Sequence, residues 1–376
     1  MLKVDILPDQ LNDPGRFREV GKRHLNAIAW KRQDYIPLGI IVNDPLNTKG
    51  IDYNQWLDAA VFFEVQAKIL RDTLTVGSDY LPILPINQLG AVLIPSMFGA
   101  ELHVPAEMAG SLQDQGPTPL PVLEDIEAAD SLQPPPMTAG IMPQFTEIIT
   151  SWRRWAPPWV EIVSAFPVGP FSQAAALRGS DLFTDLVDNP RRSRRLLSLC
   201  AEVQIEVELH LRGLIGNGKP LPISNFGVRG QGIRLGDDSI ISLSPKMIAE
   251  FAVPPIETIA ERFGPATVHF CTLPDRREDH VFESLAASPK IAMASSQFGF
   301  EYYDANVQSL RGRLAMESFY GAAHAYVCEK FGSFRDWAFD FVPRRKSDSG
   351  LILYFEVPSV ELGKELWKIW QEAHRA

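Results

Sequence analysis

Hydrophobic and polar positions follow two different periods along the chain, and these periods predict helices and strands in turn. Apolar residues at helical spacing predict helices over residues 16–32 and 56–74. Short runs of β-branched and aromatic residues predict buried strands over 35–42 and 159–166. The apolar stretch 89–102, with its Gly and Pro breaks, predicts a strand followed by an irregular turn.

The alternation becomes more regular in the second half of the chain. Strands are predicted over 221–226, 267–271, 290–296 and 350–359, and helices over 181–216, 244–264, 280–286, 306–331 and 361–376. In one of these helices, Ser244 is the expected N-cap, Pro245 the first helical residue and Gly264 the stop. Such alternation indicates βα units and a parallel sheet. Roughly eight candidate strands favour closure, so we predict an α/β fold, a (β/α)8 TIM barrel. The barrel is expected over 81–376, preceded by an N-terminal helical extension over 1–80.

Composition and charge narrow the classes of function. The 376 residues are 45% hydrophobic, which is enough for a large core. A formal charge of −10 argues against nucleic-acid binding, because phosphate contacts need a positive surface. Neither a signal peptide nor an uninterrupted apolar run of about 18 residues is visible. The three cysteines do not form a disulfide framework, so a cytoplasmic protein with reduced thiols is expected.

The stretch "VHFC" places His269 and Cys271 at the end of a predicted strand. Residues i and i+2 on a strand point to the same face, so both side chains can reach one point. Imidazole nitrogen and thiolate sulfur are natural zinc ligands, and a catalytic zinc keeps a fourth position open. Active sites of TIM barrels gather at this end of the strands. The alternative is that both side chains are simply packed at a strand end.

Three stretches resemble the uroporphyrinogen decarboxylase superfamily in order and spacing: "GPFSQAAALRGSDLFTDLVDNP", "DDSIISLSPKMIAEFAVPPIETIAERFG" and "VHFC". The resemblance extends from about Tyr35 to the C-terminal helix. It implies a TIM barrel and one of two activities, a tetrapyrrole decarboxylase or a zinc-dependent methyltransferase that works with corrinoid proteins. His269 and Cys271 match the H-x-C of the methyltransferase branch, in which zinc binds a thiol substrate and lowers its pKa.

Two departures from the family patterns bear on this choice. The decarboxylases carry a segment like "PVWxMRQAGR", whose arginines bind substrate carboxylates, whereas this chain reads "YIPLGIIVNDPLN". The methyltransferases provide a third ligand, a cysteine, near the end of the last barrel strand, and "GLILYFEVPS" contains none. Glu356 on that strand is the expected replacement, with Glu101 and Asp238 as other candidates. Cys328 lies in a helical pattern and is expected in the core.

Further site residues are predicted from their places after strands. Asp238, Glu301 and Tyr302 are expected in catalysis, and Glu101, His103, Arg229 and Arg234 in substrate binding. For three of these residues the competing interpretation is structural: a solvated loop for Asp238, aromatic packing for Tyr302 and a structural histidine for His103.

The favoured function is therefore a methyltransferase of the corrinoid-dependent type, acting on a small molecule within a demethylation system. His269, Cys271 and Glu356 are expected to hold zinc, with a corrinoid as methyl donor or acceptor. No corrinoid-binding D-x-H-x-x-G motif is visible, so the corrinoid is expected on a separate protein or as a small molecule. Nucleic acid and membrane are not expected partners. Two alternatives stay open: a metal-free decarboxylase of a tetrapyrrole or other polycarboxylate, and a non-catalytic binding partner in a methyltransferase complex.

Overall fold

The fold is mixed α/β, with a central parallel sheet. The computed structural model describes residues 6–86, 90–104, 116–163, 168–216, 227–230, 232–272, 278–320 and 323–376. Six strands form the sheet in the order β1 (Leu38–Val42), β10 (Leu351–Val357), β9 (Ala315–Tyr320), β8 (Ile291–Ser296), β7 (Ala266–His269) and β6 (Ile233–Gly236). Every neighbouring pair in it is parallel, so all six carboxyl ends lie at one edge.

Two further parallel strands flank this sheet. β2 (Ile83–Pro85) pairs with β5 (Glu161–Val163). A single parallel bridge joins Val168, a few residues beyond β5, to Gly236 at the end of β6. On the other side, the backbone N–H of Asp79 donates to the carbonyl oxygen of Leu38 in β1. The strand pairs therefore form two separate parallel sheets and do not show a closed barrel. A small antiparallel ribbon, β3 (Leu102–His103) with β4 (Thr118–Pro119), stands apart.

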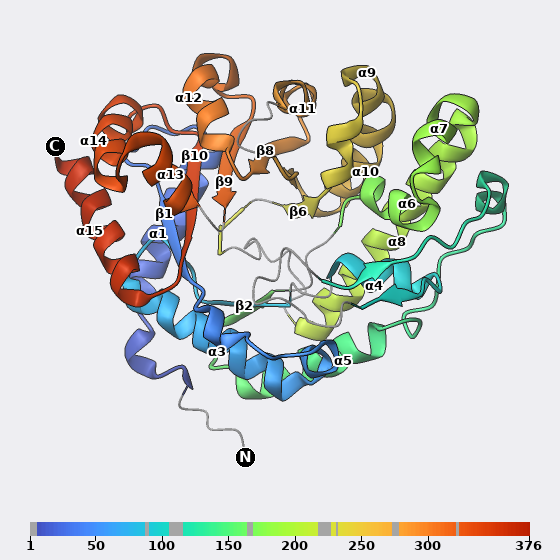
Figure 1. Cartoon of the computed structure of the whole chain (residues 1–376), viewed down its shortest axis with the longest axis horizontal. Coiled ribbons are helices and arrows are strands. Elements are labelled where there is room, and N and C mark those ends of the chain that lie inside the picture. The colour runs from blue at the N-terminus through green and yellow to red at the C-terminus, as the bar shows by residue number, and fades with distance from the viewer. Residues whose placement is uncertain are drawn as a thin grey trace.

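The helices lie around the strands, as Figure 1 shows. Their bounds are α1 Pro14–Ile28, α2 Tyr53–Leu57, α3 Ala59–Val76, α4 Gly90–Met97, α5 Met142–Trp155, α6 Pro170–Arg178, α7 Asp181–Asp188, α8 Pro190–Ile215, α9 Pro245–Met247, α10 Val253–Phe263, α11 Asp279–Ala286, α12 Gly299–Leu310, α13 Ala323–Phe331, α14 Phe334–Arg345 and α15 Val360–Arg375. A π-helical turn, Ile248–Ala252, joins α9 to α10. Among the described helices, none is both long and apolar enough to cross a bilayer.

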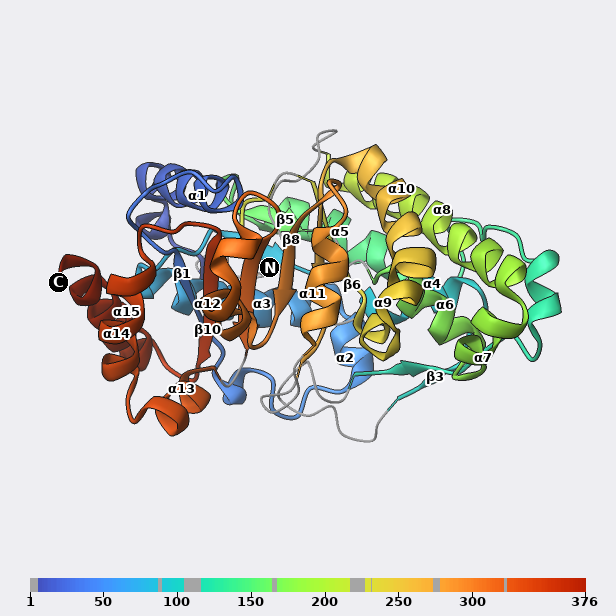
Figure 2. The same ribbon diagram turned by 90° about the horizontal axis from the view of Figure 1, so that it is seen from above.

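Helix α1 lies across the amino ends of the strands. The hydroxyl of Ser349, just before β10, donates to the carbonyl oxygen of Asn26 in α1. Within α1, His24 is fully buried and its ring lies 6.5 Å from that of Tyr354 in β10. Figure 2 places α1 along the top, with β3 and α13 at the opposite side. The two ends of the strands therefore have different neighbours.

Several sequence predictions are corrected by the structure. Helix α4 (Gly90–Met97) occupies most of the stretch 89–102, where a strand and an irregular turn were predicted, and Pro95 lies inside this helix. Strand β9 lies within the block 306–331 predicted as helical, and β2 and β6 were not predicted. The predicted strand 221–226 lies outside the described residues.

The helix start predicted at Ser244 agrees with the structure. The N-cap at Ser244 is confirmed, because its side chain accepts from the N–H of Met247. β1 lies within the segment 1–80 that was predicted as a helical extension, and it pairs along its whole length with β10. β1 is therefore part of the central sheet.

Candidate metal centre

Three side chains with metal-binding atoms meet at the carboxyl ends of β6 and β7. They are Asp238, His269 and Cys271, whose ligand atoms all lie within 4.8 Å of one another. His269 is the last residue of β7, and Cys271 follows it by two residues, on the same side of the chain. Asp238 comes two residues after the end of β6, and Gly236 there is the register partner of His269. The parallel pairing of two strands therefore brings Asp238 close to His269 and Cys271, although it precedes them by 31 and 33 positions in the sequence.

The spacing of these atoms suits one tetrahedral metal ion. His269 Nε2 lies 3.7 Å from Cys271 Sγ and 4.0 Å from Asp238 Oδ1. Two ligands bound to zinc at about 2.0 and 2.3 Å in tetrahedral geometry are about 3.5 Å apart. Small movements would bring the three atoms to these distances and leave a fourth position open. Nitrogen, sulfur and oxygen are all zinc ligands, so the residues present fit the ion.

The hydrogen bonds behind His269 determine which of its nitrogens carries the proton. The hydroxyl of Ser295 donates to Glu317 Oε1 at 2.8 Å and accepts from Arg234 at 3.0 Å. Its only proton is therefore used, and its 3.0 Å contact with His269 Nδ1 requires that Nδ1–H is the donor. Neutral His269 then presents an unprotonated Nε2 to Cys271 and Asp238, as a metal ligand must.

A buried ion pair supports this arrangement from inside the sheet. Arg234 in β6 donates to Glu317 in β9 at 3.0 Å, and the two side chains are 4% and 0% exposed. Because β7 and β8 lie between β6 and β9, the Arg234–Glu317 pair reaches across these two strands on the interior face of the sheet. An arginine and a carboxylate buried together are tolerable only because each neutralises the other.

The local pKa values favour a cation at this position. Cys271 is exposed at one side, yet desolvation of its sulfur and the nearby Asp238 raise the pKa of the thiol to about 12. Desolvation likewise raises the pKa of Asp238, and burial lowers the pKa of His269 well below its usual value. At neutral pH the thiol alone is thus a poor nucleophile. A bound cation lowers the pKa values of Cys271 and Asp238 again, because it stabilises the thiolate and the carboxylate.

The loop that carries Asp238 is anchored by its neighbour Asp237. That residue is fully buried, and its carboxylate accepts from the N–H groups of Phe171 and Ser172 at the start of α6. Burial raises the pKa of Asp237 to about 7. A Cβ on Gly169 would lie 2.3 Å from the same carboxylate, so only glycine fits there. Asp237 therefore has a structural role, and Asp238 extends from a fixed turn.

Of the predicted metal ligands, Glu356 lies elsewhere. It is half-buried on β10, beside Ile41 of β1, and it accepts a hydrogen bond from Asn43 Nδ2. Within the described residues it is not part of the group formed by Asp238, His269 and Cys271. The carboxylate that lies beside His269 and Cys271 comes from the loop after β6 and not from the last strand.

The other predicted catalytic residues do not join this group. Tyr302 on α12 is buried, with its ring stacked 4.2 Å from that of Phe282. Glu301, also on α12, accepts from Tyr326 and from Lys330 at the surface. Both residues follow β8, as predicted, but α12 directs them into helix packing.

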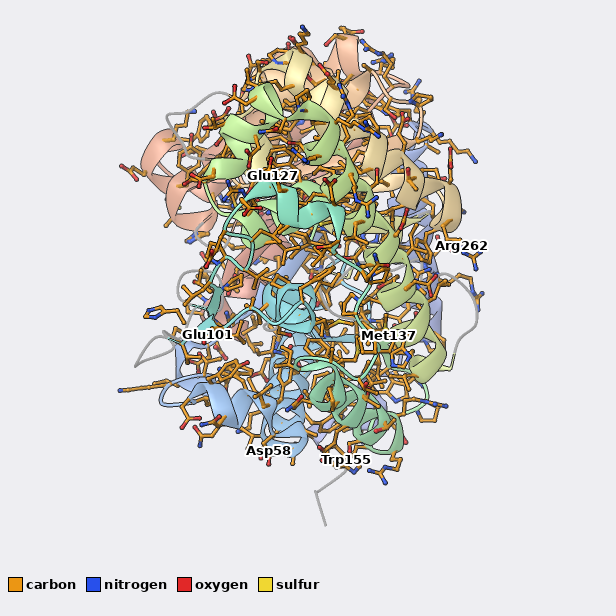
Figure 3. The ribbon with its side chains drawn as sticks, turned by 90° about the vertical axis from the view of Figure 1, so that its right-hand side faces the viewer. Asp58, Glu101, Glu127, Met137, Trp155 and Arg262 are labelled. Atoms are coloured by element: carbon orange, nitrogen blue, oxygen red, sulfur yellow. The ribbon has the colours of Figure 1, made fainter. Side chains whose placement is uncertain are left out.

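The four predicted substrate-binding residues lie at three different places. Glu101 and His103 are exposed at the β3 ribbon, and Figure 3 shows Glu101 at the rim of the molecule. Arg234 lies in the interior ion pair. Arg229 precedes β6 and lies 3.7 Å from Glu161, at the amino ends of the strands. Neither arginine provides an unneutralised charge at the carboxyl ends.

Sequence reasoning missed Ser295, Glu317 and Gln297. Gln297, just after β8, accepts from the N–H of Thr272 at 2.6 Å and so holds the chain that follows Cys271. The polar residues that end the apolar run "KIAMASS" could have indicated Ser295, because polar side chains at the end of a buried strand need partners.

Comparisons with known proteins address the fold. A scan against protein-family models gives no match, and neither does a search of the curated proteins. Among solved structures, a methyltransferase from Methanosarcina mazei is similar, with a TM-score of 0.65 over 94% of this chain and 98% of that one. The two sequences are 14% identical, so the likeness shows a shared fold and does not transfer an activity.

Proposed function

We propose that this protein is a metal-dependent methyltransferase in which Asp238, His269 and Cys271 hold a zinc ion. The observation that carries the proposal is the meeting of nitrogen, sulfur and oxygen ligands at the carboxyl ends of β6 and β7. The similar fold of the Methanosarcina mazei methyltransferase supports the same class. We further propose that the eight parallel strands close into a barrel, supported by the bridge from Val168 to β6 and the hydrogen bond from Asp79 to β1.

The residues of the chain have distinct tasks in this proposal. Ser295 holds His269 with Nε2 toward the ion, and the Arg234–Glu317 pair holds Ser295. Cys271 and Asp238 supply negative charge. The backbone N–H of Cys271 donates to Asp238 Oδ1, and this hydrogen bond holds the chain after β7 beside the loop after β6. A zinc ion bound by these residues supplies Lewis acidity, which lowers the pKa of a substrate thiol at the open position.

The proposed reaction moves a methyl group from a methylated corrinoid to the sulfur of a small thiol. The cobalt–carbon bond breaks with its electron pair left on cobalt, a sulfur–carbon bond forms, and the thiol proton passes to solvent. The corrinoid is a substrate, either free or carried by a separate protein, and the reverse direction serves demethylation.

Among the residues that the structure describes, the geometry does not support the decarboxylase alternative. It requires cations at the carboxyl ends to bind several substrate carboxylates. Arg234 is neutralised by Glu317, and Arg229 lies at the opposite end of the strands.

Methyl transfer from methylcobalamin to a panel of small thiols tests the proposal. We expect turnover by zinc-loaded protein, measured by the loss of methylcobalamin absorbance and the mass of the methylated thiol. Cys271→Ser should abolish it, and a chelator should abolish it reversibly. The matched control is Cys328→Ser, because Cys328 also has a histidine partner, His324 Nε2 at 3.5 Å, but lies on α13. Metal-independent turnover, or none by zinc-loaded wild type, contradicts the proposal, and the latter leaves the non-catalytic binding partner as the better interpretation.

A further inference from the structure

A second cleft lies at the opposite ends of the strands from the metal-binding group. It has a volume of about 700 Å³ and lies between α1 and the starts of β2 and β5. We call it the amino-end cleft and define it by Phe17, Arg18, Lys22, Lys31, Trp159 and Arg229. Trp159 and Arg229 both lie just before strands, at their amino ends. The residues that line the cleft do not include Asp238, His269 or Cys271. A TIM-barrel fold does not by itself predict a ligand site at this end.

The charge of the cleft is opposite to that of the whole protein. Four of its lining side chains are cationic and one, Glu161, is anionic, although the chain carries a net charge of −10. Within the described residues, Arg18, Lys22 and Lys31 make no ion pair. Arg229 forms an ion pair with Glu161 at 3.7 Å, a distance too long for a hydrogen bond. Concave surfaces lined by one sign of charge concentrate ligands of the other sign.

The sequence of α1 explains how these cations converge. Arg18, Lys22 and Leu25 are spaced by four and three residues, so they lie along one face of the helix. Between them Gly21 faces Arg229, and a Cβ there would lie 2.7 Å from its Nε. The absence of a side chain at position 21 lets the guanidinium lie against α1.

The rest of the cleft wall is aromatic and apolar. The rings of Phe17 and Trp159 are nearly parallel, with an interplanar angle of 15° and centroids 6.4 Å apart. Leu25, Leu81 and Pro82 add aliphatic surface. A ligand that uses both parts of the cleft needs a flat apolar body as well as negative charge.

We propose that the amino-end cleft binds a small aromatic anion, a flat ring that carries one or two carboxylate or phosphate groups. The ring lies against Phe17 and Trp159, and the anionic groups face Arg18, Lys22, Lys31 and Arg229. Carboxylates and phosphates are both recognised by such cations, and arginine can bind either through two parallel hydrogen bonds.

Calorimetric titration of the full chain with four probes tests this site. Phthalate and phenyl phosphate combine a ring with charge and distinguish carboxylate from phosphate. Benzyl alcohol has the ring alone, and inorganic phosphate has the charge alone. We expect saturable one-to-one binding of at least one aryl anion, at least tenfold tighter than either single-feature probe.

Variants assign the binding to the cleft. Arg18→Ala/Lys22→Ala changes two exposed side chains and should weaken binding at least tenfold with an unchanged circular dichroism spectrum. Lys246→Ala, an exposed lysine on α9, is the matched control and should bind like wild type, as should Cys271→Ser, because the cleft is independent of the metal-binding group. The proposal is overturned if neither aryl anion binds, if a single-feature probe binds as tightly, or if the double variant binds like wild type.

Discussion

The two ends of the parallel strands carry opposite chemistry. At the carboxyl ends, Asp238 and Cys271 offer negative and soft ligand atoms beside a neutral His269. At the amino ends, Arg18, Lys22 and Arg229 surround an aromatic wall. One end suits a metal cation, and the other suits an organic anion. The same scaffold therefore places two chemically different groups of side chains at the two ends of its strands.

The difference lies also in how the side chains are held. His269 is tied through Ser295 to the buried Arg234–Glu317 pair, so its orientation depends on the interior of the sheet. The cations of the amino-end cleft lie on the outer face of α1 or in a loop, and three of them are exposed. Precise placement is needed for metal ligation, whereas charge attraction tolerates mobile lysines. Mutations should therefore affect the two ends independently.

The largest expected effect comes from the interior pair. Glu317→Gln leaves Arg234 buried without a counter-charge, and we expect the free energy of unfolding to fall by about 3–5 kcal/mol. Urea denaturation measures it. The double variant Arg234→Met/Glu317→Leu removes both charges and should recover most of the loss. A single-variant loss below about 1 kcal/mol would show that the pair does not support the fold.

Next in size is the effect of Ser295 on metal affinity. Ser295→Ala removes the acceptor for His269 Nδ1–H, and we expect zinc affinity to fall about 10- to 100-fold, as for other residues that orient a ligand. Competition with a chromophoric chelator measures this. Binding in the amino-end cleft should not change, and an equal loss there would show that the variant acts through general unfolding.

The free energy of unfolding should depend on pH through His24, a buried residue of α1 at the amino ends of the strands. Burial lowers the pKa of His24 to about 3 in the folded chain, whereas in the unfolded chain the pKa of this imidazole is near 6.5. Between these two pH values the unfolded chain binds a proton at His24 and the folded chain does not. Stability from His24 is thus complete above pH 6.5 and is lost as the pH falls toward 3. Between pH 7.5 and 5.5 the loss is about 1.4 kcal/mol.

The matched variant for this effect is His24→Asn, whose side-chain oxygen can still accept from the N–H of Arg229. Urea denaturation at the two pH values should show that wild type loses about 1.4 kcal/mol more than the variant. His374, whose pKa is also lowered by burial, is present in both proteins and cancels. Equal pH dependence of wild type and variant would contradict a buried neutral His24.

The sequence predicted several strands whose interior positions are apolar, although it missed the short apolar strand β2, and it missed the strands with charged interior positions. β7, β8 and β10 are apolar runs and were predicted. β6 and β9 carry Arg234 and Glu317 toward the interior, where each is tolerable only because of the other. That compensation joins residues 83 positions apart and is invisible to a local hydrophobic pattern.

The candidate site shows the same limit. His269 and Cys271 were predicted as a pair because a strand places residues i and i+2 on one face. For the oxygen ligand the sequence favours Glu356, with Glu101 and Asp238 as other candidates. It cannot distinguish them, because strand order and register decide which carboxylate lies near His269. Gly236 is the register partner of His269, and this favours Asp238.

Cobalt(II) binding tests the central claim most directly, because a cobalt–thiolate bond gives an absorption band that reports the ligand set. We predict one cobalt ion per chain with a thiolate band, lost in Cys271→Ser, weakened and shifted in Asp238→Asn, and unchanged in Cys328→Ser and Glu356→Gln. No thiolate band in wild type, or a band that depends on Glu356 and is indifferent to Asp238, would contradict a metal centre built by Asp238, His269 and Cys271.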